Sequence, residues 1–322
     1  MLILDALNGS KLDAAFFDKY ASLPDTYIVH ATVNNLRLVV PDPDLDRALC
    51  DLALYRERLA TFGPSCRLLA SYADWRSLDD TQTTGLILGY QNSSFIGDKL
   101  ELLELLHALG VRIMQITHNG RNQFGDGCAV DDDHGLTDLG RQFVARCNDL
   151  GLILDTSHTG DKTTVDVAAA SKDPILVTHA NARSVFNHAR NKEDTTLRAV
   201  AERGGVVGIC FLPRLLYPRT ASSPTLEDLV RQVVHVHNIV GDEGIGFGSD
   251  FVVGQTAPER YDVLRQQGSM YEPFGLAYPL KDLDHMTVLA DALQSAGMTS
   301  SAIEKFMGLN FARVLSERLK ER

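Results

Sequence analysis

Short, uninterrupted apolar segments recur along this chain, and most are followed by an amphipathic stretch with helical periodicity. An uninterrupted apolar strand is buried on both faces, which is typical of a parallel sheet covered by helices. These segments predict strands at residues 2–4, 27–33, 67–70, 86–90, 112–117, 152–155, 175–178, 206–210 and 245–248. The stretches between and after them predict helices at residues 45–62, 99–109, 137–150, 163–171, 196–203, 226–240, 283–296, 300–307 and 311–320.

A strand followed by a helix, repeated about eight times, predicts either an open doubly wound sheet or a closed barrel. Ionisable residues follow several different strands, and no G-x-G-x-x-G follows the first strand, which favours the barrel. The 322 residues exceed the roughly 250 of a typical barrel by an amount that loops and a terminal helix pair can absorb. No repeat, low-complexity tract or linker divides the sequence. We therefore predict a single domain, residues 1–322, that folds as a (β/α)8 TIM barrel with extra C-terminal helices.

Composition restricts the classes of partner. The net charge of −11 argues against nucleic acid, because phosphate binding needs a basic patch. No apolar run approaches the roughly 18 residues of a membrane span, and no signal segment opens the chain. The five cysteines are odd in number and lack C-x-x-C spacing, which favours reduced thiols and a cytoplasmic location.

Three ionisable residues close predicted strands. His158 ends Leu152–His158, His179 ends Ile175–His179, and Asp250 ends Ile245–Asp250. Two imidazoles at the carboxyl ends of barrel strands can hold one divalent cation, with zinc as the expected ion. Asp250 can accept a proton from a bound water. The alternatives are two hydrogen-bonded structural histidines, and an Asp that caps a helix or orders a loop.

Two further residues are candidates for substrate binding. His118, just past the strand in Gln115–Asn119, can polarise a carbonyl or stabilise developing negative charge. The guanidinium of Arg190 can hold a carboxylate through two parallel hydrogen bonds, or it can pair with Glu193 or Asp194.

Three long loops are expected to shape the substrate pocket at the carboxyl ends of the strands. Residues 119–134 are rich in Gly, Asn and Asp. Residues 212–225 and 252–283 are rich in Pro, Tyr and Gly.

Several segments, in order and spacing, resemble the membrane (renal) dipeptidase family of zinc peptidases, which are amidohydrolase-like (β/α)8 barrels. The resemblance is good over residues 85–315 and weak over the first 80. The segments that carry it are Gly110–Asn119, Leu154–His158, Pro174–Asn181, Arg190–Asn191, Gly204–Gly208, Gly246–Phe251 and Gly308–Arg313.

The resemblance implies a two-zinc site, from which this sequence departs. The positions of the family's first H-x-D motif correspond to Leu7 and Gly9, and the bridging Glu corresponds to Gln91. Neither Leu nor Gly can ligate zinc, and a neutral Gln adds no negative charge between two cations. The first metal site is therefore expected to be lost, which leaves His158 and His179, with Gln91 as a weak third ligand.

The substrate side of the family's site corresponds to residues that this sequence keeps. The family's substrate-contacting His and Arg correspond to His118 and Arg190, and its catalytic Asp to Asp250. Gln91 is also expected to contact the substrate. These residues predict a small, amino-acid-like substrate. Members of the family often form dimers, so the resemblance also implies a homodimer.

Three functions remain open from the sequence. One is a hydrolase of a dipeptide or N-substituted amino acid with one zinc ion. Another is a metal-independent enzyme acting on an amino-acid derivative such as an N-methylated amine. The last is a non-catalytic protein that binds such a ligand.

Overall fold

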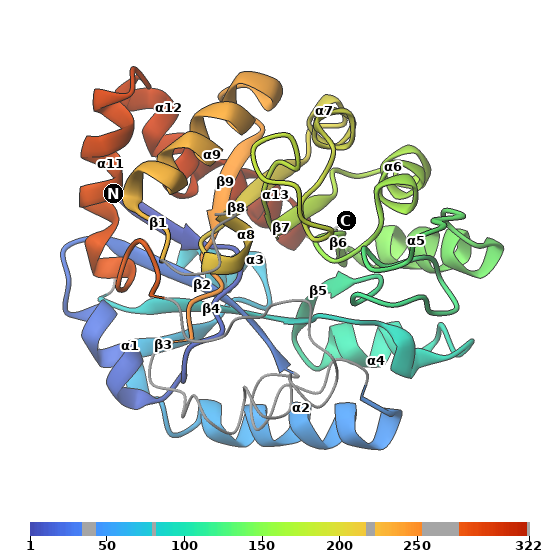
Figure 1. Cartoon of the computed structure of the whole chain (residues 1–322). Helices are drawn as coiled ribbons and strands as arrows, with labels where there is room; N and C mark the ends of the chain where they lie inside the picture. The colour runs from blue at the N-terminus through green and yellow to red at the C-terminus, as the bar shows by residue number, and fades with distance from the viewer. Residues whose placement is uncertain (34–42, 79–81, 217–222, 253–276, 321–322) are drawn as a thin grey trace.

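The computed structural model describes residues 1–33, 43–78, 82–216, 223–252 and 277–320. Its centre is a parallel sheet whose strands follow the order β1-β2-β4-β5-β6-β7-β8-β9, with helices around the outside (Figure 1). The strands are β1 (Leu2–Asp5), β2 (Thr26–Thr32), β3 (Cys66–Leu68), β4 (Thr84–Tyr90), β5 (Val111–Gln115), β6 (Ile153–Asp155), β7 (Leu176–Ala180), β8 (Val206–Cys210) and β9 (Ile245–Gly248).

The first and last strands lie side by side and close the sheet into a barrel. The backbone N–H of Ala6 donates to Phe247 O at 3.0 Å, and that of Asp250 donates to Leu7 O at 2.9 Å. Between them, the carboxylate of Asp5 accepts hydrogen bonds from the N–H and the hydroxyl of Ser249. The prediction of a TIM barrel with additional C-terminal helices is confirmed.

Eight strands form the barrel, and the short β3 lies outside this path. It pairs with Thr84–Leu86 at the start of β4, whereas β5 pairs with Leu88–Tyr90 further along. The sequence could not reveal this difference, because an apolar segment predicts a strand but not its place in the sheet.

Most helices lie where the sequence predicted them, with ends shifted by a few residues. Three short helices, α1, α3 and α8, were not predicted. The helices are α1 (Ala14–Ala21), α2 (Leu45–Leu59), α3 (Tyr72–Arg76), α4 (Leu102–Ala108), α5 (Asp138–Leu150), α6 (Asp161–Ala170), α7 (Asp194–Glu202), α8 (Pro213–Leu216), α9 (Leu226–Val240), α11 (Met286–Ser295), α12 (Ser300–Glu304) and α13 (Asn310–Leu319). Single 3₁₀ turns lie at Gly63–Ser65, Ser94–Ile96 and Leu283–His285, and a π-helical turn, Lys305–Leu309, joins α12 to α13. The predicted loops 212–225 and 252–283 lie partly outside the described residues.

Local signals explain where several helices begin. The side chains of Asp13, Asp44, Thr137 and Thr225 each accept a hydrogen bond from a backbone N–H in the first turn of the following helix. Such caps satisfy N–H groups that have no partner within the helix. No helix in the described ranges combines the length and the apolar character needed to cross a membrane.

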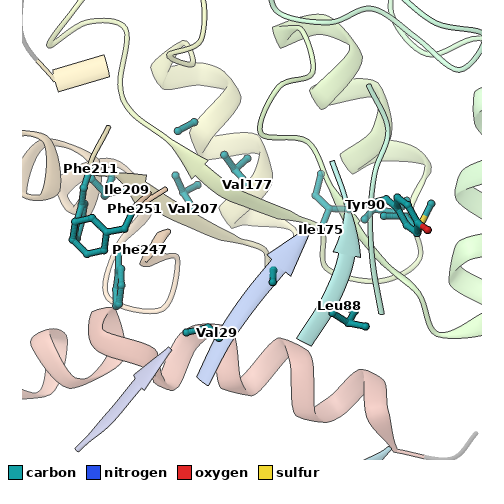
Figure 2. Close-up of a cluster of buried hydrophobic side chains, with 14 of the residues drawn as sticks. Val29, Leu88, Tyr90, Ile175, Val177, Val207, Ile209, Phe211, Phe247 and Phe251 are labelled. Carbon is teal, nitrogen blue, oxygen red and sulfur yellow. The ribbon is translucent and has the colours of Figure 1, made fainter. Parts of the chain in front are cut away.

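Apolar side chains fill the space between the strands and the surrounding helices. Figure 2 shows part of this core, with Val29 and Leu88 on one side and Val207, Ile209 and Phe247 on the other. All five are less than 2% exposed. A second cluster of buried side chains includes Ile28, Ile87, Ile113, Ile153, Leu176, Val206, Phe311 and Leu315.

The C-terminal helices support the strands that close the barrel. A Cβ on Gly308 would lie 2.9 Å from Leu2 O, so the π-helical turn approaches β1 closely. The amide of Asn310 donates to Asp242 O and Ile245 O, which fixes the start of β9. The Phe311 ring packs against Gly246, where an added Cβ would lie 2.5 Å from the ring.

This close packing generates the first prediction. Because the Phe311 ring leaves no room for a methyl group, Gly246→Ala should lower the free energy of unfolding by about 1–3 kcal/mol. Phe311→Leu, which shortens the facing side chain, should reduce the cost of Gly246→Ala when the two are combined. Urea denaturation of the single and double variants measures this coupling. If the losses in the free energy of unfolding of the two single variants add up to that of the double variant, the packing of Phe311 against Gly246 is not the cause.

Candidate functional site

Four of the predicted site residues gather where neighbouring strands end. Gln91 follows β4, His118 lies beyond β5, His158 lies beyond β6, and His179 is the penultimate residue of β7. Because β4 to β7 are consecutive and parallel in the barrel, these positions share its carboxyl end.

Gln91 and the two later histidines form a tight triangle. The Nε2 atom of Gln91 lies 2.9 Å from Nε2 of His158 and 3.1 Å from Nε2 of His179. The two imidazole Nε2 atoms are 3.0 Å apart. The His158 side chain is buried with 4% exposure and that of His179 with none. Every edge of this triangle therefore has the length of a hydrogen bond.

The His158 ring is held from its other side. Its Nδ1 lies 2.7 Å from Oδ1 of Asn119, and its face stacks on the half-buried His118 ring with centroids 4.2 Å apart. The Asn119 oxygen also accepts a hydrogen bond from the thiol of Cys128. With this oxygen as the acceptor, Nδ1 of His158 carries the proton and Nε2 presents a lone pair to the triangle.

His179 is held by a network that ends on a buried carboxylate. Its Nδ1 lies 2.8 Å from Oγ1 of Thr178, and that hydroxyl donates to Oδ2 of Asp155 at 2.8 Å. Because the single hydroxyl proton goes to the carboxylate, Oγ1 of Thr178 accepts from His179. Nε2 of His179 therefore also presents a lone pair to the triangle.

Arg190 lies behind the two histidines rather than open to solvent. Its side chain is 1% exposed, and its guanidinium donates to Ser157 O at 2.5 Å and to His179 O at 3.0 Å. These bonds tie together the backbone of the two strand ends that carry the histidines. Lys192, also 1% exposed, donates to Thr159 O and Thr164 Oγ1.

Burial and the two cations keep the imidazoles neutral. Desolvation, and then the charge of Arg190, hold the pKa values of His158 and His179 well below the usual 6.5. The same two causes lower the pKa of His118 to about 3. Burial also lowers the pKa of Lys192 to about 8. Neutral imidazoles are the form that accepts hydrogen bonds or binds a metal ion.

Asp250 lies at the seam that closes the barrel. It is the only non-glycine residue in the described ranges with a positive φ, 52°, a conformation that is uncommon for such residues. Its carbonyl accepts a hydrogen bond from the Tyr278 hydroxyl at 2.7 Å. A Cβ on Gly9 would lie 3.5 Å from Oδ1 of Asp250, so this carboxylate faces the position where the resemblance places a lost metal ligand.

The structure thus brings Gln91, His118, His158 and His179 together, places Arg190 directly behind them, and sets Asp250 beside Leu7 and Gly9. The residues that orient the imidazoles were not predicted from the sequence, namely Asn119, Asp155, Ser157 and Thr178. Asn119, Asp155 and Ser157 stand within three residues of a predicted site histidine, and Thr178 directly precedes one. This adjacency is the signal that would have pointed to them.

Comparison with known proteins identifies the family of this chain. The family model for membrane dipeptidase (Peptidase family M19) matches residues 10–322. This chain belongs to the membrane dipeptidase family. The resemblance inferred from the sequence motifs is therefore confirmed.

Relatives and solved structures extend the comparison. The chain is 28% identical to dipeptidase verJ of Clonostachys rogersoniana over 97% of its own length and 74% of that protein. It is 30% identical to dipeptidase tcpJ of Claviceps purpurea (strain 20.1), where the match spans 72% of this chain but only half of the relative. An amidohydrolase from Pseudomonas aeruginosa superimposes with a TM-score of 0.87 at 27% identity, covering 99% of this chain and 97% of the other.

The fold is also shared with a metallopeptidase from Rhodobacter sphaeroides, solved with a phosphinate mimic of the dipeptide L-Ala-D-Ala. That structure has a TM-score of 0.78 and 22% identity, and 99% of each chain is covered. At this identity the likeness concerns the barrel alone.

The neutral imidazoles predict that acid destabilises the protein. In the unfolded chain a histidine binds a proton below about pH 6.5, whereas in the folded protein these pKa values are lower. The contribution to stability is therefore complete above pH 6.5 and is lost as the pH falls. Each such histidine should remove about 1.4 kcal/mol per pH unit from the free energy of unfolding in this window.

Urea denaturation at a series of pH values tests this on His118. His118→Gln should reduce the acid slope by about one proton. His285→Gln, at the N-terminal end of α11 and far from these strand ends in the sequence, is the control for the loss of a histidine as such. Equal slopes for wild type and His118→Gln would show that His118 titrates normally in the folded protein.

Proposed function

We propose that this protein is a hydrolase that cleaves the amide bond of a dipeptide or an N-substituted amino acid, with at most one divalent cation. The observation that carries the proposal is the buried pair of neutral imidazoles, His158 and His179, whose Nε2 atoms converge to 3.0 Å at the carboxyl end of the barrel. The family relationship supports the class of reaction.

The residues present do not fit the first metal site of a two-zinc centre. Leu7 is buried and apolar, and Gly9 has no side chain. Nowhere in the described ranges do three or more His, Cys, Asp or Glu side chains lie close enough together to hold a metal ion. A metal ion at the first site therefore takes no part in the proposed reaction.

At the second site the chemistry of the donors fits a single cation. The Nε2 lone pairs of His158 and His179 would hold it, and the side-chain oxygen of Gln91 could turn toward it. A zinc ion bound there would polarise a carbonyl and make a bound water more acidic.

The other residues act directly on substrate and protons. Asp250 accepts the proton of the attacking water, and a neutral His118 donates an N–H to the carbonyl oxygen as negative charge develops on it. Arg190 attracts the substrate carboxylate by its charge and positions the imidazoles through Ser157 O and His179 O. Gln91 is the neutral polar group beside the scissile bond.

A second candidate is favoured by the hydrogen bonds of Gln91. Its amide nitrogen lies within hydrogen-bonding distance of both imidazoles, so both rings have a hydrogen-bond partner without an ion. The protein would then be a metal-independent enzyme, or a binding protein, for a small amino-acid derivative.

We also propose that the protein is a homodimer and is located in the cytoplasm.

Elemental analysis combined with a substrate panel tests the proposal. We expect no more than one zinc per chain and hydrolysis of at least one dipeptide or N-acylated amino acid. Activity should fall by two or more orders of magnitude in His158→Ala, because the imidazole pair is broken. His285→Ala is the matched control on the surface.

Two metal ions per chain would contradict the single-cation proposal. Full activity of His158→Ala would show that the chemistry occurs elsewhere. Binding of an amino-acid derivative without turnover, in a metal-free protein, would favour the second candidate.

A further inference from the structure

The Nε2 atoms of His158 and His179 would repel each other if nothing lay between them. Both imidazoles are protonated on Nδ1, since Asn119 Oδ1 and Thr178 Oγ1 accept from them. Two lone pairs on buried side chains therefore face each other at 3.0 Å. Buried acceptors without a donor are costly, so this arrangement requires a group with positive character.

Gln91 supplies such a group. A carboxamide nitrogen carries two N–H bonds, and Nε2 of Gln91 lies 2.9 Å and 3.1 Å from the two imidazole acceptors. One N–H can thus be donated to each ring.

The remainder of the Gln91 environment holds the residue in place. The side-chain amide of Gln115, on β5, donates to Gln91 O and to Thr117 O. This pair of bonds fixes the backbone from which the Gln91 side chain reaches the histidines.

Charge also distinguishes Gln91 from a carboxylate. The pocket contains the buried cations Arg190 and Lys192, and Gln91 contributes no negative charge to offset them or a divalent ion. A dication between the histidines would be repelled by these two cations in a low-dielectric interior.

We propose that the carboxamide of Gln91 takes the place of a cation between His158 and His179, donating one N–H to each ring and competing with metal ions for both lone pairs. Gln91 is then the residue that sets the metal affinity of the pocket. This proposal rests on the proposed function only in that both concern the same residues.

Cobalt(II) titration of chelator-treated protein tests the inference, read by the visible absorption of the bound ion. Gln91→Met keeps an unbranched side chain of similar length but removes both donors. If Gln91 competes with metal, Gln91→Met should bind cobalt at least as tightly as the wild type. If Gln91 acts instead as a ligand through its oxygen, Gln91→Met should bind more weakly, and the inference is overturned.

Gln91→Glu provides the second arm, because it adds an anionic ligand at the same position. Its cobalt affinity should exceed that of the wild type by at least about tenfold, an effect of the size that ligand-environment changes produce. Gln142→Glu, exposed on α5, is the control for added charge and should match the wild type. Equal affinity of Gln91→Glu and wild type would also overturn the inference.

Thermal melting gives a readout that is independent of cobalt absorption. The wild-type melting temperature should not change with chelator, since the amide satisfies the histidines without an ion. That of Gln91→Glu should fall in chelator and rise with zinc. If Gln91→Glu does not fold, the comparison of Gln91→Met with wild type decides the question alone.

His158→Ala should abolish the cobalt signal in every background, which separates this pocket from surface histidines. Failure of the inference leaves the proposed hydrolase intact, because a wild-type protein that binds one cobalt ion tightly can still turn over the substrate panel. Failure of the proposed function appears only in that panel.

Discussion

The position of both central imidazoles depends on the carboxylate of Asp155. Strands β6 and β7 share a single register pair, Asp155 with Leu176, so few backbone hydrogen bonds hold them together at this point. Asp155 compensates by accepting from the N–H and hydroxyl of both Ser157 and Thr178. The residue after each of these is a site histidine. One buried carboxylate therefore joins two strand ends and orients the pair.

A buried carboxylate with the same arrangement of hydrogen bonds lies at the seam where β1 and β9 close the barrel. Asp5 accepts from the N–H and hydroxyl of Ser249, and also from Asn8 and the N–H of Leu7. Burial raises the pKa of Asp5 to about 7, although these hydrogen bonds lower it. A buried carboxylate thus supports the strand ends at both places. Asp155 orients the two imidazoles, whereas Asp5 lies beside Leu7 and Gly9.

The sequence predicted the barrel because its strand signal is local. Uninterrupted apolar runs identify buried parallel strands, and the rule that polar residues follow such strands located His118, His158 and His179. Gln91 was identified only through the family resemblance. The exclusion of β3 from the barrel and the short helices α1, α3 and α8 were not predicted, because tertiary contacts decide such short segments. Sequence also showed that Gln91 cannot supply a charge. It could not show that the amide nitrogen faces both rings, since that depends on side-chain torsions and on Asn119 and Thr178.

The seam between β1 and β9 has a consequence for how the chain reaches its native state. Asp5 and Ser249 are 244 positions apart, and the π-helical turn that braces β1 comes later still. Contacts of such long range carry a large loop-closure entropy and slow folding. During synthesis on the ribosome, the edge of β1 that pairs with β9 therefore stays unpaired until residues 245–248 have emerged, and an unpaired strand edge is open to wrong pairing in the nascent chain.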